Sequence, residues 1–189
     1  KYPSVEAGTT GTMALARDEM VAANADAYTT SLIAFLLIIA LFILSFRMWV
    51  APLLAGVCLL LGIIWAGGIA ALTVGSLNIM TSMFAVILIG LGIDFSIHII
   101  SGYTENRAAG WDIGEALRQT LLKSGKGVIT GGITTACAFF TLTVSETAGM
   151  REFGIVAGSG VICCMLAAII VLPAMLSGRD RLLSRWRRE

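Results

Sequence analysis

The sequence predicts an all-α membrane protein, a polytopic bundle of five transmembrane helices. Of its 189 residues, 57% are hydrophobic and only 13% are charged, and the mean hydropathy is +0.89. A membrane-spanning helix needs about 20 mostly apolar residues. Five stretches qualify and use most of the chain, which leaves no room for a separate soluble domain: residues 28–46, 49–72, 77–100, 128–144 and 153–176.

Residues 1–27 precede the first predicted span and contain Arg17, Asp18, Glu19 and Asp26 among alanines. This pattern is typical of a helix outside the membrane that leads into the span. The chain does not begin with Met and has no charged start, apolar run and cleavage pattern of a signal peptide. We therefore expect a piece of a longer protein, in which residues 1–27 end an extracytoplasmic domain. A plain hydrated leader is the alternative.

The basic residues predict the orientation, because cytoplasmic loops are enriched in Lys and Arg. Only three of the 13 basic residues lie on the same side of the predicted bundle as the N-terminus: Lys1, Arg17 and Arg151. We therefore expect an extracytoplasmic N-terminus and a basic cytoplasmic tail over residues 178–189. The remaining ten of the 13 basic residues are expected to lie in the cytoplasm: Arg47, Arg107, Arg118, Lys123, Lys126, Arg179, Arg181, Arg185, Arg187 and Arg188.

A polar connection over residues 102–127 separates the third and fourth spans. Within it, Ile113, Leu117 and Leu121 recur every four residues, while the charged residues lie elsewhere. This spacing predicts an amphipathic cytoplasmic helix over 111–123 that lies at the membrane interface. A solvated connecting helix is an equally good interpretation.

Several classes of chemistry have no support in the sequence. No phosphate-binding loop, dinucleotide fingerprint, serine elbow, zinc-binding HExxH pair or second intramembrane Asp is present. We expect a protein that is not an enzyme, with no catalytic residue, no bound metal or other cofactor and no nucleic-acid partner. The four cysteines have no CxxC spacing and lie in predicted spans, so we interpret them as small packing residues: Cys58, Cys137, Cys163 and Cys164.

Asp94 is the most informative residue, because it is an acid within the third predicted span. A carboxylate in the centre of a membrane helix costs at least about 2.5 to 3.5 kcal/mol on insertion scales, so such residues usually face a bundle interior and carry protons, ions or substrate contacts. At about 100° per residue, one strip of this helix collects Gly90, Asp94, His98, Ser101 and Glu105.

The fourth span carries a second strip, and hydroxyl groups are suitable partners for a protonatable acid or a water chain. Its members are Thr130, Thr134, Cys137, Thr141 and Ser145. We expect the two strips to face each other and to form a proton relay of Asp94, His98, Ser101, Thr130 and Thr134. The alternatives are a neutral or paired structural acid at Asp94, a hydrogen-bonded structural imidazole at His98 and threonines that only pack helices together.

Glycines with small-residue spacing predict close helix contacts. Gly90 and Gly92 remove side-chain bulk beside Asp94, and two GxxxG pairs occur in the fourth and fifth spans. We interpret six glycines as packing residues: Gly90, Gly92, Gly127, Gly131, Gly154 and Gly158.

Several motifs occur together in an order that resembles the resistance-nodulation-division (RND) superfamily, and the MMPL and Patched-like branch fits best. They are Ser76-Leu77-Asn78-Ile79-Met80-Thr81-Ser82, Gly90-Leu91-Gly92-Ile93-Asp94-Phe95-Ser96-Ile97-His98, Tyr103-x-Glu105, Glu115-Ala116-Leu117, Gly131-Gly132-Ile133-Thr134-Thr135, Phe153-Gly154 and Leu172-Pro173-Ala174.

The resemblance implies spans two to six of one repeat in a transporter built from two six-helix halves, each with an inserted extracytoplasmic domain. It implies a protein that uses the proton gradient, with Asp94 as the proton carrier, to export lipids or other hydrophobic molecules. We expect it in a bacterial inner membrane, with an archaeal membrane as the alternative. The implied partners are membrane lipids, the substrate, the remaining half with its periplasmic domains and, in some members, further copies of the chain.

Two other functions remain open at this point. The same unit resembles the sterol-sensing domain, which implies a lipid-responsive receptor or regulatory module, and it is similar to SecDF-type accessory factors of protein secretion. Some mycobacterial members have a Tyr directly after the acid, whereas Phe95 follows it here. A tyrosine-assisted relay is therefore not expected, and His98 or Ser101 would take that place.

Overall fold

The protein is described from a computed structural model that covers residues 11–46, 50–75, 81 and 83–186. Helices and the turns between them account for all of these residues, and no strand occurs among them. The α-helices are α1 (Thr12–Phe46), α2 (Val50–Thr73), α4 (Phe84–Ala108), α5 (Ile113–Thr120), α6 (Lys126–Thr141), α7 (Ala148–Leu166) and α8 (Leu172–Trp186).

Shorter segments join some of these helices without a break. A π-helical turn, η1 (Leu121–Gly125), connects α5 to α6, and a second one, η3 (Ala167–Val171), connects α7 to α8. A 3-10 turn, η2 (Leu142–Val144), ends α6. The predicted amphipathic helix over 111–123 is therefore the first part of a continuous rod that leads into the fourth predicted span.

Four stretches within the described residues are long and apolar enough to cross a membrane: Leu53–Thr73, Phe84–Ala108, Ile113–Val144 and Ala148–Asp180. They confirm the prediction of an all-α membrane protein. The remaining predicted span, 28–46, lies within α1, where several side chains fall outside the described set. The start of the third predicted span, at residues 77–80, also lies outside it.

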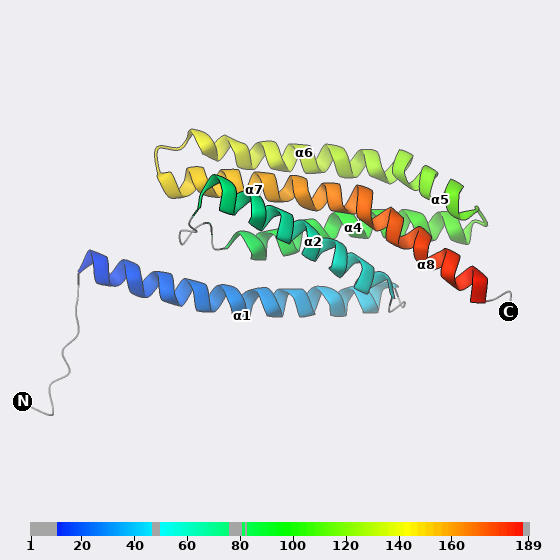
Figure 1. The fold of residues 1–189 in the computed structure, drawn as a ribbon, viewed down its shortest axis with the longest axis horizontal. Coiled ribbons are helices and arrows are strands. Elements are labelled where there is room, and N and C mark those ends of the chain that lie inside the picture. Colours follow the sequence, from blue (N-terminus) through cyan, green and yellow to red (C-terminus); the bar gives the residue numbers. More distant parts are fainter. Residues whose placement is uncertain (1–10, 47–49, 76–80, 82, 187–189) are drawn as a thin grey trace, which may run out of the picture.

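The long helices run in alternating directions, so the start of α1 and the end of α8 lie at opposite ends of the bundle (Figure 1). Helix α7 lies at the centre and packs against α2, α4 and α6, while α1 packs against α2 and α4. As a result, α4 is lined by α2 and α7 along its length, and α5 lies beside its C-terminal end.

The core of this bundle includes many small and β-branched side chains beside its leucines and aromatic residues. Ile89, Ile93 and Ile100 of α4 are buried, as are Val156 and Val161 of α7. Such side chains let helices approach closely, which is how membrane helices gain packing energy without a hydrophobic driving force. All four cysteines are free thiols, and three of them, Cys58, Cys163 and Cys164, are buried in this core.

Candidate functional site

Helix α4 divides its side chains between two faces. One face is buried against α2 and α7 and includes Ile93 and Ser96. The predicted polar strip occupies the other face and is exposed at every position: Gly90, Asp94, His98, Ser101 and Glu105. The described chain therefore leaves this strip open along about 22 Å of helix, since 15 residues rise about 1.5 Å each.

The exposure of Asp94 differs from the expectation that it faces the interior of this bundle. Isoleucines occupy the face of α4 that packs against α2 and α7. The other face, which carries Asp94, therefore points away from these two helices. Within the described part of the chain, Asp94 makes no hydrogen bond or ion pair. Because an acid facing lipid is costly, this open face needs a cover that the described helices do not supply.

The threonine strip of α6 is exposed as well, at Thr130, Thr134, Cys137 and Thr141. The hydroxyl of Thr130 donates to the carbonyl of Lys126 at 2.9 Å, and that of Thr134 donates to the carbonyl of Thr130 at 2.8 Å. Both hydroxyl protons are therefore used within α6. The oxygen atoms keep free lone pairs, so they can accept a hydrogen bond from a water or an acid.

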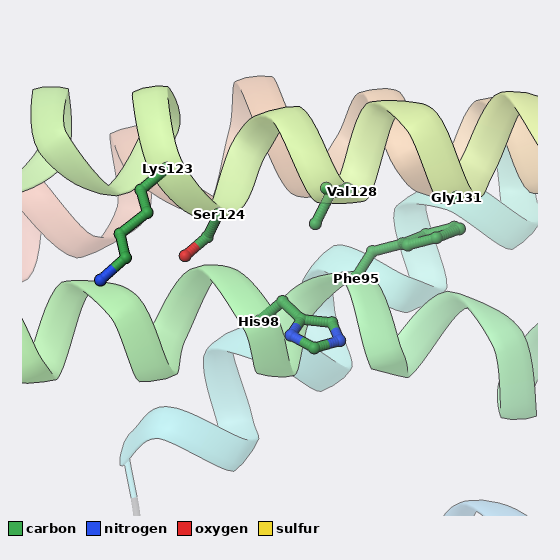
Figure 2. Close-up of a pocket in the computed structure, with 7 residues that line it drawn as sticks. Phe95, His98, Lys123, Ser124, Val128 and Gly131 are labelled. Carbon is green, nitrogen blue, oxygen red and sulfur yellow. The ribbon is translucent and has the colours of Figure 1, made fainter.

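A pocket of about 310 Å³ lies between α4 and the η1–α6 rod (Figure 2). Phe95 and His98 contribute to its wall from α4, and Lys123, Ser124 and Val128 reach toward α4 from the rod (Figure 2). Its remaining lining residues are Gly127 and Gly131. The pocket has polar groups and room for several water molecules, so it can hold water next to the imidazole of His98.

Of the two predicted strips, only His98 lines this pocket. The pocket brings His98 next to the α6 backbone at Gly127 and Gly131, whereas Asp94, Ser101, Thr130 and Thr134 are not among its lining residues. Lys123, expected only as a cytoplasmic basic residue, and Ser124 were not predicted as site residues. Their position just before the fourth predicted span, one turn before the Gly127-x-x-x-Gly131 pair, is the signal that could have identified them.

The six predicted packing glycines fall into two groups. A Cβ atom on Gly92, Gly154 or Gly158 would lie 2.7 or 2.8 Å from an atom of another helix or turn, so these three glycines permit close contacts. No atom lies within 4 Å of a Cβ built on Gly90, Gly127 or Gly131. Gly127 and Gly131 instead border the pocket, and a packing role there remains a prediction that needs a partner outside the described residues.

Metal binding has no basis in the described ranges, which contain no group of three or more His, Cys, Asp or Glu side chains placed to hold an ion. The groups that can carry chemistry on the open face of α4 are the carboxyls of Asp94 and Glu105, the imidazole of His98 and the hydroxyl of Ser101, and α6 adds its row of threonine hydroxyls. These groups can bind, hold and pass protons.

Comparison with known proteins adds independent information. The sequence pattern of the MMPL family matches residues 2–189. The chain is 28% identical over 181 residues to the protein MJ1562 of Methanocaldococcus jannaschii, covering 95% of this chain and 46% of that protein. It is 30% identical over 169 residues to the hopanoid transporter HpnN of Burkholderia multivorans, covering 88% of this chain and 19% of the transporter.

A third relative is the siderophore exporter MmpL5 of Mycobacterium tuberculosis, which is 25% identical over 184 residues, or 95% of this chain and 19% of the exporter. The chain thus spans less than half the length of each of these relatives. The family match covers nearly every residue and agrees with the ordered motifs around Asp94. The chain therefore belongs to the MMPL family.

Proposed function

We propose that this chain is the proton-carrying part of an RND-type exporter of lipids or other hydrophobic molecules, with Asp94 as the intramembrane proton carrier. The observation that carries the proposal is the placement of Asp94 on an open polar face of α4, within a stretch apolar enough to cross a membrane. The relatives named as a hopanoid transporter and a siderophore exporter support the substrate class.

The proton path that we propose follows the open face of α4. Asp94 takes up a proton from the extracytoplasmic side, and His98 lies one turn further on, at the pocket that it shares with η1 and α6. Ser101 continues the strip toward the C-terminal end of α4, while Thr130 and Thr134 offer acceptor oxygens on α6. The energy source is the proton gradient, so the activity needs no catalytic residue and no bound cofactor.

The remaining half of the transporter covers the open face in this proposal. A neutral acid and a charged one differ strongly in their cost of burial, so loading and unloading Asp94 changes how well the two halves pack together. The setting is a bacterial inner membrane, with the N-terminus outside and the C-terminal tail in the cytoplasm. The periplasmic domains and the membrane lipids are the other partners, and a homo-oligomer is compatible with this arrangement.

The experiment that tests the proposal is pH-difference infrared spectroscopy of the full-length protein in lipid. The expected result is a pH-dependent carboxyl band that disappears in the Asp94→Asn variant, which also loses transport. Glu146→Gln, which changes an exposed acid in the turn before α7, serves as the matched control. This variant is expected to keep the carboxyl band and the transport activity. Normal transport by Asp94→Asn, or a carboxyl that never titrates, would falsify the proposal and favour a lipid-responsive receptor.

A further inference from the structure

The C-terminal end of α4 is tied to α8 by a cluster of three side chains. The hydroxyl of Tyr103 donates to Oδ2 of Asp180 at 2.6 Å, and Nε of Arg107 lies 3.3 Å from the same oxygen. Tyr103 is only 2% exposed. The cluster therefore connects residues 77 positions apart in the sequence and runs from the buried Tyr103 to the exposed Arg107.

Each member of this cluster depends on the others. A buried tyrosine hydroxyl needs a partner, and the Asp180 side chain, which is 15% exposed, accepts from one neutral and one charged donor. Hydrogen bonds to an ionised group are about twice as strong as neutral ones. Arg107 is fixed in turn, because its Nη1 donates to the carbonyl of Trp111 at 2.6 Å.

The opposite side of the same helix end is held by the α5–η1 rod. Nδ2 of Asn106 donates to Oγ1 of Thr120 at 3.0 Å and to the carbonyl of Ala116 at 3.3 Å. A Cβ on Gly102 would lie 2.6 Å from Oγ of Ser124, so α4 and η1 touch closely there. Contacts on two sides fix both the rotation and the axial position of α4.

We propose that Asp180 is a positioning residue for the proton carrier. Through Tyr103 and Arg107, it fixes the register of α4 against α8 and thereby the position of Asp94 and His98 on the open face. Asp94 lies nine residues before Tyr103 on the same unbroken helix, about 13 Å along its axis, so a rotation or shift at the cluster reaches Asp94. This inference rests on the proposed function, because it assigns Asp180 a part in that proton transfer.

The groups that face Asp180 are Tyr103 and Arg107 from α4 and Arg179 from α8 itself, whose Nη1 lies 3.9 Å from Oδ1. Helix α5 also packs against α8 and carries Glu115 and Arg118, which pair with each other at 2.7 Å. Removing the Asp180 charge thus leaves Arg107 without its carboxylate partner, whereas removing the Tyr103 hydroxyl leaves the ion pair in place.

The test uses the full-length protein in lipid and two measurements. In hydrogen–deuterium exchange, Tyr103→Phe and Asp180→Asn are expected to speed exchange at residues 101–108 by about fivefold, the change that follows from losing roughly one net hydrogen bond. In infrared titration, both variants are expected to move the midpoint of the Asp94 carboxyl band, and Asp180→Glu is expected to bring both values back toward the wild type.

Two matched controls remove similar groups elsewhere. Thr104→Val removes a hydroxyl that bonds only within α4, and Glu115→Gln breaks an exposed ion pair; neither is expected to move the Asp94 midpoint. Unchanged exchange in both test variants overturns the inference. Faster exchange with an unmoved midpoint also overturns it, because the cluster then only packs helices. If the wild-type Asp94 band never titrates, the proposed function fails and the positioning role fails with it, while the exchange data still show whether Asp180 holds α4.

Discussion

Single residues on α7 determine how closely its neighbours approach. A Cβ on Gly154 would lie 2.7 Å from the carbonyl oxygen of Phe139, and one on Gly160 would lie 2.5 Å from Cδ1 of Leu88. The first of these contacts is with backbone, which cannot move aside as the end of a side chain can. Gly154 is therefore required for the contact between α6 and α7.

Gly154→Ala is expected to destabilise the protein by about 1 to 3 kcal/mol, the usual cost of overpacking a tight core. Gly68→Ala is the control, because nothing lies within 4 Å of a Cβ at that position in α2, and Ala there is expected to stabilise the helix by about 0.5 to 1 kcal/mol. Thermal unfolding in detergent measures both changes. Equal stability of the two variants would show that α6 and α7 do not touch at Gly154.

Gly131 allows a different test, because the space beside it is open and borders the His98 pocket. Gly131→Leu is expected to fill part of the pocket and displace its water, which lowers proton-coupled transport several-fold while leaving the unfolding temperature nearly unchanged. Transport by the full-length protein and its thermal unfolding are the two measurements, with Gly68→Leu as the control. Undiminished transport with Gly131→Leu would mean that protons do not pass through this pocket.

At the scale of elements, the two π-helical turns lie where the α5–η1–α6 and α7–η3–α8 segments pass α4. Both η1 and η3 contact α4. A π turn contains one residue more than the regular helix would, and such turns are rare and often occur at functional sites. In the α5–η1–α6 segment, the extra residue sets the rotation of α6 relative to α5. Helix α5 can then turn Ala116 and Thr120 toward α4, while Gly127 and Gly131 of α6 border the pocket.

Inserting one Ala after Leu122, an exposed residue of η1, is expected to turn α6 by about 100° relative to α5, the rotation of one helical residue. One of the two faces must then leave its partner, so the unfolding temperature is expected to fall and exchange at residues 113–131 to rise. Leu122→Ala keeps the chain length and is expected to change neither value much. An insertion variant as stable as the wild type would rule out a role for η1 in setting this register.

At the scale of the whole molecule, the open polar faces of α4 and α6 lie on one bundle that otherwise exposes apolar side chains, such as Leu36 of α1 and Ile170 of η3. Apolar side chains can face lipid, whereas Asp94 and His98 cannot do so without a large cost. We therefore expect lipid to contact the exposed apolar side chains and protein to cover the polar faces of α4 and α6.

A spin label distinguishes these neighbours in the full-length protein, since oxygen dissolves in lipid and reaches lipid-facing labels. A label at Thr134→Cys is expected to show low oxygen accessibility, and one at Ile170→Cys is expected to show high accessibility. Both are made in a Cys137→Ala background, because Cys137 is the exposed thiol among the four. Equally high accessibility at both positions would mean that lipid, and not the remaining half of the protein, covers the α6 face.

The sequence predicted an all-α membrane protein because its spans are long apolar stretches with polar ends. It predicted the shared face of Asp94, His98 and Ser101 for a different reason, since helical periodicity alone places residues on a face. It did not predict that this face is open in the described chain, because periodicity does not reveal which face a neighbour covers. The contact between Tyr103 and Asp180 was also missed, since it joins two distant segments and depends on how α4 and α8 cross.

Helix α1 is one uninterrupted helix of 35 residues, about 52 Å long, whereas the hydrocarbon core of a bilayer is about 30 Å thick. It also packs against α4. A tilt of only about 5° at one end of such a rod displaces the other end by about 4 to 5 Å, as the length of the helix dictates. In the proposed exporter, this helix would act as a lever arm, because a small adjustment of α4 inside the membrane would move the far end of α1 by several ångströms.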